Sequence, residues 1–147
     1  MIIENAGPEF SPQDIEAIES KLDARLPDDY RYFLSQYNGG TPTPDTVDVP
    51  DAPGSPTDVQ VFFGIGRRVE SSNLYWNLSL IDDRCPSHHV LPIACDSGGN
   101  LFCLKIERGI AAAVVYCDLD SSNSTLYAVA PSFGEFLLSL RPYSEEK

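Results

Sequence analysis

Long apolar runs, secretion signals and paired cysteine motifs are all missing from this sequence of 147 residues. No apolar stretch approaches the roughly 20 residues that cross a bilayer. Residues 1–5 lack the basic start and long apolar run of a secretory signal. We therefore expect a cytoplasmic protein with no membrane partner. Its four cysteines form no Cys-x-x-Cys pair, so in a reducing cytosol all of them are expected to be free thiols.

Residues suited to catalysis are also scarce. His88 and His89 are the only imidazole bases, and no Gly-x-Ser-x-Gly turn presents a serine nucleophile. Cys85 lies near both histidines, but metal sites usually need a second pair of ligands, so we interpret Cys85 as part of a surface loop after a helix. The sequence therefore predicts no enzyme activity, no cofactor and no metal. A hydrolase that uses converging carboxylates is kept as an alternative.

Basic residues are few compared with acidic ones. Ten Lys and Arg face 22 Asp and Glu, which gives a formal net charge of −12. Such a surface repels nucleic-acid phosphates and anionic membranes, so we expect no nucleic-acid partner. A basic protein is the natural electrostatic complement. The alternative interpretation is that the acidity serves solubility alone.

Residues 41–58 concentrate acids and prolines. Five prolines within this segment exclude a regular helix or a central strand. A long loop inside a compact domain is usually functional or disordered. Two interpretations stay open here: a solvated mobile insertion, or a loop that contacts a partner. In the second case the partner-binding residues would be the four aspartates of the segment: Asp45, Asp48, Asp51 and Asp58.

Residues 26–40, LPDDYRYFLSQYNGG, contain the start and stop signals of a helix. Pro27 suits the first helical position, and the two aspartates that follow favour the positive end of the helix dipole. Asn38 and the two glycines after it tolerate a left-handed φ and end the helix. Aromatic and aliphatic residues recur at helical spacing and predict one buried stripe: Tyr30, Phe33, Leu34 and Tyr37. An earlier helix is expected to begin at Ser11.

The second half of the chain contains most of the predicted strands. A strand over 59–65 and a helix over about 72–84 precede a hairpin formed by 90–96 and 101–106. Trp76 on that helix is expected to lie in the core, with an interface anchor as the alternative. Further strands are expected over 111–118 and 126–129. Ser132 and Glu135 form a capping box that begins a last helix. We predict a single α+β domain over 1–147, with two N-terminal helices, a mostly antiparallel twisted sheet of about five to six strands and a C-terminal helix packed on it.

Several motifs resemble the SUKH superfamily. The helix at 26–40 shows the pattern Leu-Pro-acidic-Tyr, then Phe-Leu, then Tyr-Asn-Gly-Gly. Further matching blocks follow in order along the chain: VFFG at 61–64, LPIACD at 91–96, GGN at 98–100, VYCD at 115–118 and SFGEFL at 132–137. The superfamily includes fungal regulators of cell-wall synthesis and many bacterial immunity proteins that neutralise toxins. The resemblance implies an α+β fold and a protein that binds another protein.

Together, the resemblance and the charge favour an immunity protein. It would bind a cognate toxin, such as a nuclease or another basic toxin domain, and block it without chemistry of its own. The alternative is a regulatory scaffold or adaptor of the cell-wall-regulator type. Placing the four aspartates of 41–58 at the interface rests on charge and expected exposure, because the resemblance transfers no contact residues to them.

Overall fold

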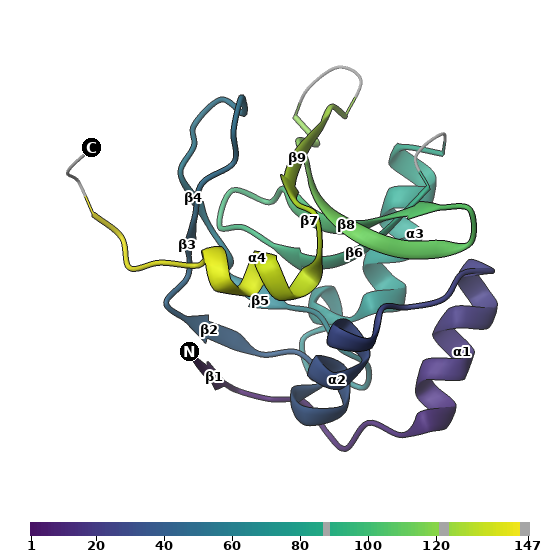
Figure 1. Cartoon of the computed structure of the whole chain (residues 1–147). Helices are drawn as coiled ribbons and strands as arrows, with labels where there is room; N and C mark the ends of the chain where they lie inside the picture. Colours follow the sequence, from purple (N-terminus) through teal and green to yellow (C-terminus); the bar gives the residue numbers. More distant parts are fainter. Residues whose placement is uncertain (87–88, 121–123, 145–147) are drawn as a thin grey trace.

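The computed structural model describes residues 1–86, 89–120 and 124–144. Its centre is an antiparallel five-stranded sheet in the order β5-β6-β7-β8-β9 (Figure 1). These strands are β5 (Val61–Phe62), β6 (Val90–Cys95), β7 (Leu101–Glu107), β8 (Ile110–Cys117) and β9 (Leu126–Ala130). The helices are α1 (Pro12–Leu22), α2 (Asp28–Tyr37), α3 (Leu74–Arg84) and α4 (Phe133–Ser139), with a short 3-10 helix, η1, at Glu70–Ser72. The predicted α+β fold is confirmed.

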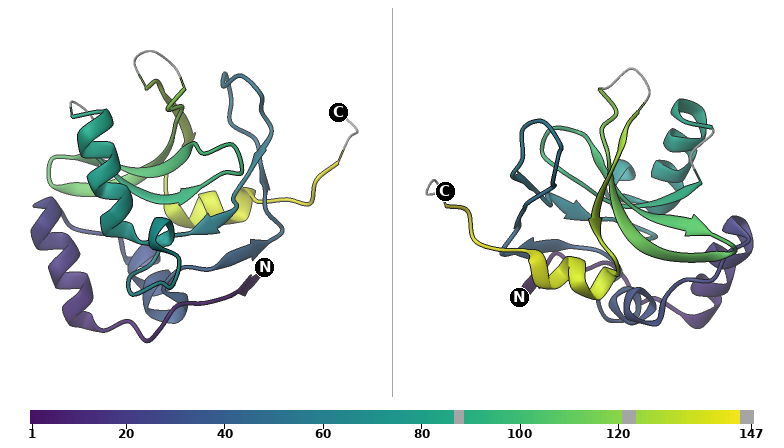
Figure 2. Two further views of the ribbon diagram at one scale, coloured as in Figure 1. Left: turned by 180° about the vertical axis from the view of Figure 1, so that it is seen from behind. Right: turned by 45° about the horizontal axis from the view of Figure 1, so that its top comes forward.

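Helices lie on both faces of the sheet. α4 crosses the front in the view of Figure 1, whereas α3 covers the back, as the reversed view in Figure 2 shows. Two small antiparallel pairs flank the main sheet: β1 (Ile2–Glu4) with β2 (Thr41–Thr43), and β3 (Thr46–Val47) with β4 (Thr57–Asp58). No helix in the described part of the chain is both long and apolar enough to cross a bilayer.

Local signals set the ends of the first two helices. Ser11 caps α1: its hydroxyl accepts the Asp14 N–H at 3.2 Å, and the Asp14 carboxylate accepts the Ser11 N–H at 2.8 Å. Pro27 is the N-cap of α2, so this helix begins at Asp28, one residue later than predicted. Tyr30, Phe33 and Leu34 are buried as expected. Tyr37 is 37% exposed, so its predicted place in the buried stripe is wrong, although its ring packs against Phe33 with centroids 5.3 Å apart.

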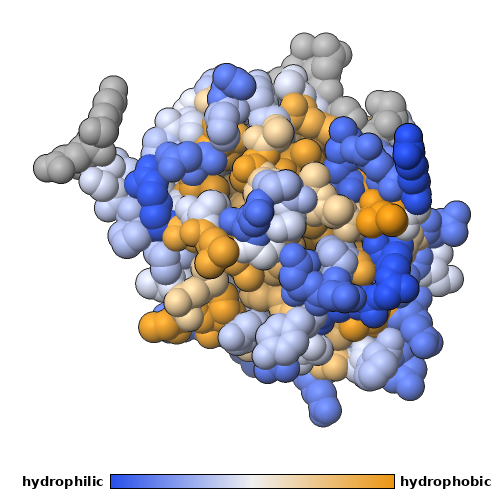
Figure 3. Space-filling view, viewed as in Figure 1, coloured by the Kyte–Doolittle hydropathy of each residue, from blue (hydrophilic) through white to orange (hydrophobic). Residues whose placement is uncertain are grey.

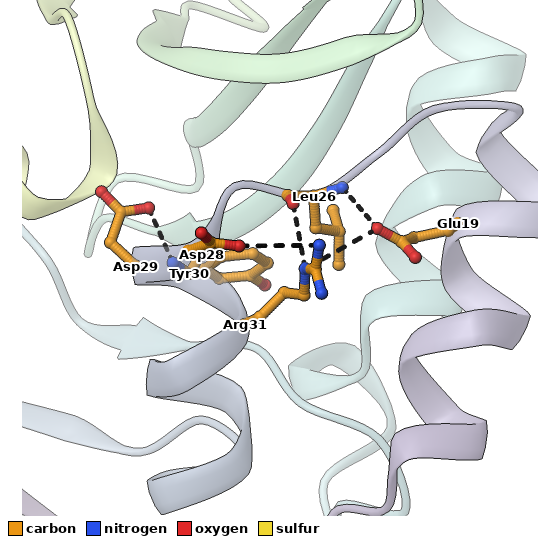
Figure 4. A network of polar contacts seen from close by, with 6 residues as sticks. All are labelled: Glu19, Leu26, Asp28, Asp29, Tyr30 and Arg31. Atoms are coloured by element: carbon orange, nitrogen blue, oxygen red, sulfur yellow. Dashed lines mark hydrogen bonds and ion pairs between the residues drawn. The ribbon is translucent and has the colours of Figure 1, made fainter.

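The connection between α1 and α2 is held by one carboxylate and one guanidinium (Figure 4). Glu19 of α1 accepts the Leu26 N–H at 2.7 Å, and Arg31 Nε donates to the Leu26 carbonyl at 3.1 Å. The Arg31 side chain also lies 3.9 Å from Glu19 and 3.6 Å from Asp28. These contacts orient the two helices at the turn where the chain reverses.

Asn38 joins three separate segments at the end of α2. Its φ of 49° is left-handed, as the sequence predicts. The buried side-chain amide donates to the carbonyls of Pro8 at 2.9 Å and Ile65 at 2.8 Å, and its oxygen accepts the Ile65 N–H at 2.8 Å. Gly64 packs so closely here that a Cβ would lie 2.1 Å from the Asn38 carbonyl oxygen. The residue therefore fixes both the N-terminal segment and the loop after β5.

A second buried polar group connects the β6–β7 turn to its neighbours. The Asp96 carboxylate, 3% exposed, accepts the Asn100 N–H and the Thr57 hydroxyl, each at 2.8 Å, and the Tyr116 hydroxyl. Burial, and then the hydrogen bond with Asp96, raise the pKa of Tyr116. Because a buried charge needs such partners, Asp96 is a structural carboxylate that holds the turn against β4 and β8.

Two features of the back face differ from expectation. Trp76 was predicted to lie in the core but is 40% exposed, because α3 turns its Leu74, Leu78 and Ile81 side toward the sheet. Cys85 is buried at the end of α3, so its assignment to a surface loop is wrong. All four cysteines are free, and burial raises the pKa of Cys117 to about 12. Neutral thiols of this kind act as small apolar side chains.

Replacing Asn38 tests the connecting role of its amide. Asn38→Ala is expected to lower the free energy of unfolding by about 3 kcal/mol, because the buried Asn38 amide loses its three hydrogen bonds with the backbone of Pro8 and Ile65. Gln36→Ala, at an exposed position in the same helix, should change it by less than about 0.5 kcal/mol. Urea denaturation followed by circular dichroism measures both. Equal effects would show that the Asn38 hydrogen bonds do not stabilise the fold.

Two buried tyrosines should respond differently to loss of the hydroxyl. Tyr116→Phe is expected to cost about 2 kcal/mol, because the Asp96 carboxylate loses a donor. The Tyr30 hydroxyl is buried and has no hydrogen-bond partner among the described residues. Tyr30→Phe should therefore leave the free energy of unfolding unchanged or raise it by up to about 1 kcal/mol. Thermal and urea denaturation measure the stability of both variants. A larger loss of stability in Tyr30→Phe than in Tyr116→Phe would contradict this prediction.

Candidate protein-binding surface

Residues 41–58 contain three short strands, β2, β3 and β4, and residues 48–56 between β3 and β4 form neither helix nor strand. After β2, the segment folds into the β3–β4 hairpin, in which Thr46 pairs with Asp58 and Val47 with Thr57. Val47 and Val49 are 0% and 1% exposed, so this segment contributes two apolar side chains to the core. The physical reason is alternation: the two valines point into the core, whereas the intervening Asp48 points outward. The hairpin stands at one side of the sheet, facing β9 (Figure 1).

Asp48 anchors this hairpin to the chain that follows α4. Arg141 donates from Nε to one Asp48 carboxylate oxygen at 2.9 Å and from a terminal nitrogen to the other at 2.8 Å. Backbone hydrogen bonds between Thr46 and Arg141 lie beside this pair, at 2.8 and 2.9 Å. The hydrogen bonds from Arg141 lower the pKa of Asp48. Its charge is therefore ionised but largely balanced within the protein.

Asp58 has a comparable internal role at the other strand of the hairpin. Its half-buried carboxylate accepts the Ser97 N–H at 2.8 Å and the Ser97 hydroxyl. The neighbouring Thr57 donates to Asp96, so β4 is bound to the β6–β7 turn at two successive residues. Asp58 is therefore poorly placed to give its carboxylate to a partner.

Asp45 and Asp51 are the two predicted site residues whose side chains remain available. Both are exposed, and neither forms an ion pair within residues 1–86, 89–120 and 124–144. The structure therefore divides the predicted set of four aspartates: Asp48 and Asp58 hold the hairpin in place, and Asp45 and Asp51 face solvent.

Beside the hairpin lies a hollow of about 650 Å³ that sequence reasoning missed. Pro50 and Asp51 border it on the hairpin side, and β8 and β9 form much of its wall. Lys105 and Glu107 of β7 also line it and pair with each other at 3.2 Å. Figure 3 shows apolar residues gathered in this upper region, between the hairpin and β9. The sequence carries no signal for such a hollow, because its walls come from segments far apart along the chain.

The surface formed by the hairpin and the hollow has features of a protein-binding site. Exposed carboxylates beside an apolar hollow match the polar rim and apolar centre of protein interfaces. Among the described residues, no group of three or more His, Cys, Asp and Glu side chains is arranged to hold a metal ion. Of the residues considered for a metal site, Cys85 is buried, His89 is exposed, and His88 lies outside the described residues.

Comparison with known proteins places the fold in a family. The sequence matches the SMI1 / KNR4 family (SUKH-1) over residues 9–139, a span that includes all four described α-helices and the five-stranded sheet. It is also 28% identical over 144 residues to the SPbeta prophage-derived uncharacterized protein YokK of Bacillus subtilis (strain 168), covering 87% of this chain and 73% of that protein. The chain therefore belongs to the SMI1 / KNR4 family (SUKH-1), in agreement with the resemblance of its motifs.

Proposed function

We propose that this protein is an immunity protein that binds a cognate toxin in the cytoplasm and neutralises it without catalysing a reaction. The observation that carries this proposal is the pair of exposed, internally unpaired aspartates, Asp45 and Asp51, on a hairpin that is itself firmly anchored. A rigid support for exposed charge reduces the entropy lost on binding. Membership of the SUKH group supports the same class of function.

The net charge of the protein favours a toxin with a basic surface. The formal net charge of −12 attracts a basic surface and repels an acidic one. Nucleases and related toxins must bind phosphates, so their substrate surfaces are commonly basic. Carboxylates at Asp45 and Asp51 would occupy positions that phosphates take on such a surface. The interface would bury on the order of 1,600 Å² in total, of which the hairpin and the adjoining hollow form one part.

Co-expression tests the proposal directly. A candidate toxin domain that the chain captures from its native cell is expressed in a sensitive host with and without the chain, and growth is recorded. We expect the chain to restore growth and to co-purify with the toxin. Undiminished killing in the presence of soluble chain would exclude the immunity function.

Two variants that remove equal charge from different surfaces test whether the hairpin contributes to toxin binding. Asp45→Asn with Asp51→Asn should weaken binding of the inactivated toxin about tenfold and flatten its dependence on salt, mainly through slower association. Asp82→Asn with Asp83→Asn removes the same charge from exposed positions on α3 and serves as the control. Its effect should be less than about threefold. Calorimetry and stopped-flow at low and physiological salt measure both. Equal behaviour of the two variants would remove the hairpin from the interface.

A further inference from the structure

A second surface, separate from the hairpin, combines a cleft with exposed apolar side chains. The cleft holds about 340 Å³ and opens between β1, α2 and α4. Its walls are mainly apolar and include Ile3, Tyr32, Phe33, Tyr37, Leu137 and Leu138. We call it the α2–α4 cleft. Phe33 forms its floor as part of the core, since that side chain is only 3% exposed.

The rim of the α2–α4 cleft exposes side chains that folding normally covers. Leu138 is 86% exposed, Tyr32 67% and Tyr37 37%, and Met1 and Ile2 are exposed beside them. Most of the exposed large apolar side chains in the described part of the chain gather here. Figure 3 shows this concentration at the lower left, over β1 and α4. A contiguous patch of this kind marks a contact surface, and tyrosine is enriched among residues that dominate binding energy.

Asp29 is the acidic residue among those that line the cleft, and the elements around it carry more acids than bases. The three elements that form it carry the acids Glu4, Asp28, Asp29 and Glu135, and Arg31 as their single base. Figure 4 shows Arg31 turned toward Glu19, Leu26 and Asp28, whereas Asp29 points to the other side. Arg31 therefore does not neutralise the cleft.

Asp29 is held in place at the mouth of the cleft. Its carboxylate accepts the Tyr30 N–H at 2.7 Å through one oxygen and the Gly134 N–H of α4 at 2.8 Å through the other. Both donors are uncharged, so the carboxylate keeps its negative charge while its position is fixed between α2 and α4. A fixed charge beside an apolar cavity favours a ligand in which a cation lies next to an apolar group.

We propose that the α2–α4 cleft binds a segment of a partner protein in which a bulky apolar side chain enters the cavity and a neighbouring Lys or Arg meets Asp29. A second copy of this chain is a poor occupant, because it would bring the same acids and a formal charge of −12 against themselves. That the partner is the toxin rests on the proposed function; the chemistry of the segment rests on the cleft alone.

Synthetic peptides test this inference without the toxin. The full-length chain, labelled with ¹⁵N, is titrated with a short peptide in which Phe-Leu is flanked by lysines, and with a second peptide in which glutamates replace the lysines. We expect saturable shifts centred on the amides of Tyr32, Tyr37 and Leu138. The lysine peptide should bind at least about tenfold more tightly. Equal affinities, no binding, or shifts elsewhere on the protein would overturn the proposal.

Matched variants separate the cleft from general apolar adhesion. Leu138→Ser should weaken the lysine peptide about tenfold, with an unchanged melting curve because Leu138 is 86% exposed. Ile110→Ser removes another exposed aliphatic side chain, at the start of β8, and should leave affinity unchanged. Equal affinities of the two variants would overturn the proposal. So would a wild-type dimer that Leu138→Ser dissociates, because the occupant would then be a second copy.

The peptide and toxin experiments can fail separately. Peptide binding that depends on Leu138, without protection against the toxin, would retain the cleft and reject the immunity function. Protection that survives Leu138→Ser, with no peptide binding, would retain immunity and reject the cleft.

Discussion

The packing of α2 against α4 is the interaction on which the rest of this structure depends. Phe133 is fully buried between the helices, with ring centroids 4.9 Å from Tyr30 and 5.1 Å from Phe33. Asp29 adds a polar contact to the same junction through the Gly134 N–H. Because α2 precedes most of the sheet and α4 follows it, this contact joins distant parts of the chain. It also creates the α2–α4 cleft and places Arg141, just after α4, against the β3–β4 hairpin.

The acidic residues of this protein are not equivalent. Glu19, Asp48, Asp58 and Asp96 each accept hydrogen bonds that fix a turn or a hairpin, so their charge is committed to the fold. Asp45 and Asp51 have no such role, and Asp29 keeps an exposed charge while it positions α4. Counting charge along the sequence does not distinguish the carboxylates that are paired within the protein from those that are not. Function would therefore depend on the carboxylates that the fold does not neutralise.

The features predicted well from sequence are those in which a residue constrains its own backbone. Ser11 and Ser132 cap helices where expected, and Asn38 ends α2 with a left-handed φ. The turn at 97–100 joins β6 and β7 for the same reason, since Gly99 adopts a φ of 90°. These signals act over a few residues and do not depend on the rest of the fold. Their order along the chain also carries the family resemblance, which is why fold class and family could be predicted together.

Side-chain environment could not be predicted in this way. Asp48 meets Arg141 across 93 residues, and Asp58 meets Ser97 across 39, so nothing near either aspartate in the sequence indicates that it is paired. Tyr37 and Trp76 were both predicted to be buried on their helices, yet they are 37% and 40% exposed. Periodicity identifies the apolar side of a helix, but burial depends on which element packs against it and how far that element extends. The sequence alone therefore determined the helix ends, the turns and the net charge, because these depend on single residues and their neighbours. Only tertiary packing decided which aspartates remain unpaired and where the apolar cleft lies, because both depend on contacts between distant segments.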